Sequence, residues 1–170
     1  MCIRDRCGKD RGPADVIAGL NTVLCREARQ QYVTAEYLYL DTANGVGRHA
    51  AGAHPLPLLW RRSTQSLEKV GESGLLLGVR PDEPYGESEF HFEAGDRLLL
   101  YTDGLVEAEN ASGESFGEAA LLAFINERQD YGTEQFVELL LEEALSWSRN
   151  GQEDDITIVA IDLKGPAHHS

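Results

Sequence analysis

Two short acidic segments are the parts of this 170-residue chain best suited to carry chemistry. Asp103-Gly104 follows the apolar run LLLYT, and Asp154-Asp155 directly precedes ITIVAID. A carboxylate at the end of a buried strand is held rigidly, and a neighbouring glycine allows a ligand to approach closely. Hard cations such as Mg²⁺ and Mn²⁺ prefer carboxylate oxygens, so the two segments would form a cation site if the fold brought them together.

Each acidic segment also has a plainer interpretation. Asp-Gly is a common turn dipeptide, so Asp103-Gly104 alone would be interpreted as a turn. Adjacent carboxylates occur in solvated loops, which would account for Asp154-Asp155 without any ligand. The segments taken singly therefore do not establish a metal site.

The histidines and tryptophans are weaker candidates for a chemical role than the acidic segments. His54, in AGAHPLPLL, is the residue that could be nominated as a general base, but no serine or cysteine nucleophile motif accompanies it. We interpret it as a structural histidine in a loop. His49 and His91 are predicted to lie in strands, and Trp60 and Trp147 are interpreted as packing residues.

The elements of the amino-terminal half follow from apolar spacing and turn residues. A helix is predicted over residues 13–29, where Pro13 suits the first turn and apolar residues recur at helical spacing. YVTAEYLYLD and GVGRHAAGA are predicted to pair as a hairpin around Asn44-Gly45. Short strands broken by glycine and proline are expected over residues 61–95.

The elements of the carboxyl-terminal half must position both acidic segments. A buried strand is predicted over residues 98–101, followed by helices over 116–128 and 133–149, the second capped by Thr133. After a turn at Asn150-Gly151, ITIVAIDL is predicted to be a strongly apolar final strand. Because strands and helices do not alternate as in βαβ units, the layout predicts an α+β fold with antiparallel sheet covered by helices.

Composition excludes several classes of protein. The formal net charge of −14 argues against binding to nucleic acid and to anionic membrane surfaces. No apolar run approaches the roughly 20 residues that span a bilayer, and no secretory signal follows the basic start, so a cytoplasmic location is expected. The three cysteines, Cys2, Cys7 and Cys25, show no C-x-x-C spacing and support neither zinc nor a disulfide framework.

Taken together, these strings resemble the sporulation-phosphatase (SpoIIE/RsbU-like) branch of the metal-dependent (PPM, type 2C) serine/threonine protein phosphatases. PADVIAGLNTVL is similar to the second helix of that branch, AAGAHPLPLL to its Ala-Gly-His-x-Pro-Pro loop and GLLLGV to its Pro-Leu-Gly segment. The most specific match is FEAGDRLLLYTDGLVEAENASGESFG, followed by DDITIVAIDL. The resemblance runs from about Pro13 to Lys164 in the order of the family.

The resemblance implies an αββα sandwich with a two-metal site of Mn²⁺ or Mg²⁺, whose bound water attacks a phosphoserine or phosphothreonine without a covalent phosphoenzyme. Carried over by position, Asp103 and Asp154 would be metal ligands, and Asp155 would support them or coordinate through water. Gly104 would allow close approach at Asp103, and no catalytic residue beyond the metal ligands is nominated. The implied substrate is a phosphorylated anti-sigma-factor antagonist, and the implied upstream neighbour is a sensory or receiver domain of a bacterial signalling protein.

The chain also departs from the pattern of the family. A complete domain begins with a Gly-Asp-x-x-Asp strand and an Asp-Val-x-Gly-x-Gly-x-x-Ala turn, and neither string is present here. We therefore expect residues 13–164 to be the carboxyl-terminal part of the domain, without its first strands, its first helix and the aspartate that bridges the two metals. Residues 1–12 are left unassigned, with a non-native origin considered, and residues 165–170 are expected to be a tail.

Two other functions stay open at this level. A catalytically inactive, phosphatase-like regulatory or binding module would account for the absent bridging carboxylate. A glycosidase with paired carboxylates has only the number of acidic residues in its favour, because nothing indicates an acid placed opposite a nucleophile.

Overall fold

The computed structural model describes residues 11–27, 32–148 and 155–164. None of the helices in these ranges is long and apolar enough to cross a membrane. The predicted turn at Asn150-Gly151 and the predicted tail at 165–170 lie outside them.

The described chain forms two compact units. The first contains the described residues up to Leu56 together with Lys69–Ala94, and the second contains Pro57–Glu68 together with the described part of Gly95–Leu163. Each unit has its own sheet and its own hydrophobic core.

The sheet of the first unit is built on a hairpin. Strands β1 (Ala35–Asp41) and β2 (Val46–Gly52) pair antiparallel along their full length. The turn between them is fixed by Asp41, whose carboxylate accepts hydrogen bonds from the backbone and the side-chain amide of Asn44, and by Gly45 at a φ of 67°. The predicted hairpin is therefore confirmed.

Two short strands pair with the other edge of β2. Strand β6 (Ser88–His91) pairs antiparallel with the first part of β2, and β5 (Ser73–Gly74) pairs parallel with its end. Both strands fall in the stretch where short, interrupted strands are predicted, and together they make β2 the central strand of this sheet.

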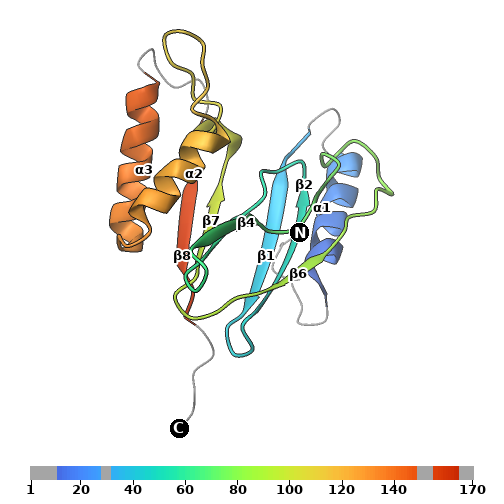
Figure 1. Cartoon of the computed structure of the whole chain (residues 1–170). Helices are drawn as coiled ribbons and strands as arrows, with labels where there is room; N and C mark the ends of the chain where they lie inside the picture. The colour runs from blue at the N-terminus through green and yellow to red at the C-terminus, as the bar shows by residue number, and fades with distance from the viewer. Residues whose placement is uncertain (1–10, 28–31, 149–154, 165–170) are drawn as a thin grey trace. The chain divides into compact units, whose positions relative to one another are not determined.

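Helix α1 (Pro13–Glu27) packs on β1 and β2, as Figure 1 shows in blue. Its fully buried Ile17 meets Ala50 of β2 and two buried side chains of the following loops, Leu77 and Tyr85. The spacing of apolar residues thus predicted both the helix and its buried face.

A buried amide fastens α1 to the loop beyond β5. The side chain of Asn21 is fully buried, and its Nδ2 donates to the carbonyl oxygen of Arg80 at 2.7 Å. Its Oδ1 accepts the backbone N–H of Gly78 at 2.8 Å. Asn21 therefore satisfies loop groups that would otherwise lack a partner.

The sheet of the second unit has the strand order β4-β3-β7-β8. Strand β4 covers Ser66–Lys69, β3 covers Leu58–Arg61, β7 covers Arg97–Tyr101 and β8 covers Ile158–Asp162. Strand β7 is antiparallel to both of its neighbours, β3 and β8. The predicted buried strand before Asp103 is thus an inner strand of this sheet, between β3 and β8.

Helices α2 (Gly117–Arg128) and α3 (Thr133–Trp147) pack on one face of this sheet (Figure 1). They form the larger core, which includes Leu99 of β7 with Leu121 of α2 and Phe136 of α3. Both helices confirm the sequence prediction to within two residues at each end.

The predicted cap of α3 is wrong. Gly132 occupies the cap position, and Thr133 is the first helical residue. The Thr133 hydroxyl donates instead to Oδ2 of Asp162 in β8, at 3.2 Å. The helix ends at Trp147 rather than at residue 149, because Ser148 leaves the helical backbone with a ψ of 65°.

Arg97 connects three parts of the second unit. Only 7% of its surface is exposed, and its Nε donates to Oδ1 of Asp162 at 2.6 Å. A terminal nitrogen donates to the carbonyl oxygen of Tyr131 at 2.7 Å, and the guanidinium lies over the ring of Phe136. The side chain therefore holds β7, β8 and the start of α3 together.

The final strand is shorter than predicted, and it is only partly buried. It begins at Ile158 rather than at Ile156, and as the edge strand it leaves Val159 45% exposed. Its apolar sequence reflects packing of one face on the helical core rather than burial on both faces.

Candidate functional site

Asp103 lies at the end of an inner strand of the second unit. Strand β7 ends at Tyr101, Thr102 keeps an extended backbone, and Asp103–Leu105 form one turn of 3-10 helix. Leu105 is fully buried and anchors this turn, whereas the Asp103 side chain is exposed. Its Oδ1 accepts the backbone N–H of the buried Gly104 at 3.1 Å. One carboxylate is thus presented to solvent from a fixed backbone.

The segment that enters β8 is fastened beside Asp103. The last pair of the β7–β8 ladder is Tyr101 with Ile158, and the backbone N–H of Thr102 continues it by donating to the carbonyl oxygen of Thr157 at 3.1 Å. The Thr102 hydroxyl accepts the backbone N–H of Thr157 at 2.9 Å and donates to the carbonyl oxygen of Asp155 at 3.1 Å. A single side chain therefore holds the entrance of β8 at two points.

This arrangement brings two of the predicted residues to the same end of the β7–β8 pair. Asp103 follows Thr102 directly, and the exposed Asp155 is bonded to Thr102 through its backbone. Asp154 lies outside the described residues. The role of Gly104 toward a ligand stays a prediction, and its backbone N–H donates to Oδ1 of Asp103.

The donor set fits a hard cation. Neither Asp103 nor Asp155 takes part in any ion pair within the described ranges, and carboxylate oxygens are the ligands that Mg²⁺ and Mn²⁺ prefer. The described residues contain no group of three His, Cys, Asp or Glu side chains placed to hold a metal ion. The described part of the site therefore offers two carboxylates.

Thr102 is the residue of this site that the sequence reasoning missed. It occurs in the string YTDG, and its partner Thr157 occurs in DDIT, so both belong to the motifs quoted for the resemblance. The sequence did contain a signal for this contact. Thr102 directly follows one strand, and Thr157 directly precedes the strand that pairs with it. Without the pairing of β7 with β8, however, nothing in the sequence connects the two.

His54 has local contacts only. It is partly buried in the loop after β2, where its Nδ1 lies 3.1 Å from the carbonyl oxygen of Pro55 and 3.8 Å from the Glu36 carboxylate. His49 lies fully buried in β2 and His91 lies in β6, both in strands as predicted. These contacts are consistent with a structural histidine at position 54.

Two solved phosphatase domains share this fold. The SiaA-PP2C domain of Pseudomonas aeruginosa gives a TM-score of 0.80 at 16% identity, covering 94% of this chain and 65% of that one. The phosphatase domain of SpoIIE from Bacillus subtilis gives a TM-score of 0.67 at 16% identity, covering 95% of this chain and 71% of that one. The chain therefore has the α+β fold of PP2C phosphatase domains, which confirms the predicted fold class.

The family of the chain is established by comparison of its amino-acid sequence with a family model. The model of the family described as Stage II sporulation protein E (SpoIIE) matches residues 2–164, and the chain belongs to that family. Phosphoserine phosphatase RsbU of Bacillus subtilis (strain 168) is 22% identical over 153 residues, which are 89% of this chain. They are only 45% of RsbU, so the chain spans less than half the length of this relative.

Proposed function

We propose that the chain supplies the Asp103 and Asp154-Asp155 side of a metal-dependent serine/threonine phosphatase site. The observation that supports this most strongly is the double hydrogen bond of Thr102, which fastens the entrance of β8 beside Asp103. Family membership supports the same reaction, since RsbU is named a phosphoserine phosphatase.

The acidic residues are the metal ligands in this proposal. Asp103, Asp154 and Asp155 hold Mn²⁺ or Mg²⁺, directly or through water, and the bound cations supply a water of lowered pKa as the nucleophile. Asp103 is oriented by the N–H of Gly104, and Asp155 is held in place through its carbonyl oxygen by Thr102. In the family pattern a further, bridging aspartate belongs to a Gly-Asp-x-x-Asp strand, a string that these 170 residues do not contain.

We infer further that the substrate is a phosphorylated protein of the anti-sigma-factor antagonist type, recognised in the cytoplasm by a protein that also carries a sensory or receiver domain. The support for this substrate is the resemblance to the SpoIIE/RsbU branch and the match to RsbU. The acidic net charge of −14 is consistent with a protein partner rather than nucleic acid.

Hydrolysis of p-nitrophenyl phosphate by a protein that carries these residues together with the Gly-Asp-x-x-Asp strand of the family, with and without Mn²⁺, tests the reaction. We expect Mn²⁺-dependent turnover that falls by more than about tenfold in Asp103→Asn, because the substitution removes a carboxylate ligand while keeping its shape. Asp82→Asn, at an exposed position of the first unit, is the matched control and should leave turnover unchanged. Turnover that survives in Asp103→Asn would refute the metal assignment.

The alternative is a phosphatase-like binding module without catalysis. It is favoured by the absence from these 170 residues of the Gly-Asp-x-x-Asp string, which carries the bridging aspartate in the family pattern. Retention of a phosphoserine peptide by folded, Mn²⁺-loaded chain without any release of phosphate would support the alternative. Release of phosphate from the same peptide would exclude it.

A further inference from the structure

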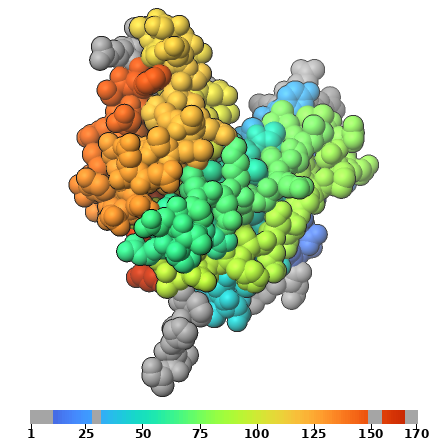
Figure 2. Space-filling view, viewed as in Figure 1, coloured from blue at the N-terminus to red at the C-terminus, as the bar shows by residue number. Residues whose placement is uncertain are grey.

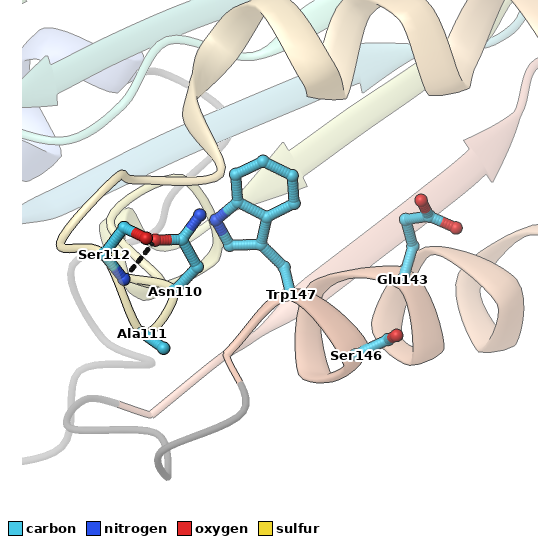
Figure 3. A pocket seen from close by; sticks show the side chains of 6 residues that line it. All are labelled: Asn110, Ala111, Ser112, Glu143, Ser146 and Trp147. Atoms are coloured by element: carbon cyan, nitrogen blue, oxygen red, sulfur yellow. Dashed lines mark hydrogen bonds between the residues drawn. The ribbon is translucent and has the colours of Figure 1, made fainter.

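A pocket of about 340 Å³ opens on the second unit, where the loop after the 3-10 turn meets the last turn of α3 (Figure 3). It lies outside the acidic site and is formed entirely by described residues of one unit. Its lining consists of Asn110, Ala111, Ser112, Glu143, Ser146 and Trp147.

Trp147 forms the aromatic wall of the pocket. The indole packs edge to face on Phe116, with ring centroids 6.1 Å apart, and its Nε1 donates to the carbonyl oxygen of Glu114 at 2.9 Å. These contacts fix the ring and engage its only polar atom, yet 36% of the side chain stays exposed. Part of a residue whose indole is held by these contacts therefore stays exposed to a ligand.

The loop wall is also fixed by its own hydrogen bonds. Oδ1 of Asn110 accepts the backbone N–H groups of Ser112 and Glu114, and Nδ2 of Asn110 donates to the Glu114 carboxylate at 3.0 Å. The Asn110 amide is thus engaged within the turn. Within the described ranges no hydrogen bond or ion pair engages the carboxylate of Glu143, which projects from α3 on the same side as Trp147 (Figure 3).

The surroundings of the pocket favour positive charge. Helix α3 contains no lysine or arginine, and neither does the segment 103–116 that supplies the loop wall. The pocket lies at the carboxyl-terminal turn of α3, where the helix dipole places partial negative charge. Figure 2 shows the surface of this helix in orange. Four of its exposed residues are glutamates, Glu134, Glu138, Glu142 and Glu143.

We propose that this pocket binds the guanidinium group of an arginine side chain presented by a protein partner. The planar guanidinium stacks on the face of Trp147, as cations do on indole rings, and pairs with the Glu143 carboxylate. The site needs no metal ion and no phosphoryl group, so it is independent of the proposed phosphatase reaction.

The indole N–H signals give a direct readout, because the chain has only two tryptophans and Trp60 is buried. We would titrate ¹⁵N-labelled chain at low ionic strength with the peptide acetyl-Gly-Arg-Gly-amide. The indole signal of Trp147 should shift with saturation while that of Trp60 stays in place. The citrulline peptide, a neutral analogue of the same shape, should cause no shift.

Two charge-neutralising variants of α3 locate the interaction. Glu143→Gln should weaken binding of the arginine peptide by about fivefold, the upper range for an exposed ion pair. Glu138→Gln removes the same charge from an exposed position that does not line the pocket, and it should change the affinity by less than about twofold. Both positions are exposed, so both variants should fold, which an unchanged Trp60 signal would verify.

Three results would overturn the proposal. The first is an equal shift with the citrulline peptide, which would mean that charge is not recognised. The second is an equal loss of affinity in Glu138→Gln and Glu143→Gln, which would mean that only the overall charge matters. The third is the absence of any shift of the Trp147 signal with the arginine peptide, which would mean that the pocket does not bind a guanidinium group.

Discussion

Replacing Thr102 with valine removes the two hydrogen bonds that hold the entrance of β8 and keeps the shape of the side chain. The hydroxyl accepts the Thr157 N–H at 2.9 Å and donates to the Asp155 carbonyl at 3.1 Å. A hydrogen bond contributes about 0.5–1.5 kcal/mol net, and water can replace part of these two because they are exposed. We therefore expect the free energy of unfolding to fall by about 1–2 kcal/mol.

The same substitution should also weaken metal binding. Thr102 does not bind the cation in the proposed site but positions the segment that carries Asp155, and loss of a supporting residue of this kind reduces metal affinity by about tenfold. Asp103 keeps its own bond to the N–H of Gly104, so the site is loosened on one side only.

Urea denaturation followed by circular dichroism measures the stability of the Thr102→Val variant, and a Mn²⁺ titration measures its affinity. Thr102→Ser is the matched control, because serine keeps the hydroxyl group and should behave like the parent chain in both assays. The reasoning is refuted if valine leaves stability and affinity unchanged. It is equally refuted if serine loses as much as valine.

Three further substitutions test other contacts of the fold. Arg97→Leu should lower the free energy of unfolding in urea by about 2–4 kcal/mol, because two hydrogen bonds from a buried guanidinium are lost, and a change below about 0.5 kcal/mol would contradict this. Asn21→Leu should cost about 2–3 kcal/mol in the same assay, since it leaves the N–H of Gly78 without its partner. The side-chain amide of Asn44 is the main cause that lowers the pKa of Asp41 below 3.8, so Asn44→Ala should raise that pKa in an NMR titration of the carboxyl group. A carboxyl group with a lowered pKa in the folded state stabilises the fold at pH values above the pKa of the unfolded chain. The stability deficit of Asn44→Ala should therefore shrink as the pH falls through about 4.

The local elements were predictable because their signals are local. Asn44-Gly45 between two β-rich runs predicted the hairpin, and the spacing of apolar residues predicted the helix that begins at Pro13. The cap of α3 was not predictable in this way. Thr133 has the right residue type for a cap, but Asp162, remote in sequence, accepts its hydroxyl instead.

In the candidate site too, the local features were predictable and the contact between segments remote in sequence was not. The sequence places Asp103 after a buried strand and Asp155 before the final apolar strand, and the structure confirms both local positions. The sequence could not show that Thr102 joins the two segments, because this contact depends on the pairing of β7 with β8 across more than 50 residues. The metal-binding role of the acidic residues stays a prediction.

Mn²⁺ binding, followed by the electron paramagnetic resonance signal of the free ion, is the most direct test of the claim that Asp103 and the segment of Asp155 form one cation site. The parent chain and Asp82→Asn should deplete the free signal equally, and Asp103→Asn and Asp155→Asn should each weaken binding by about tenfold. Equal depletion by all four proteins would contradict the account.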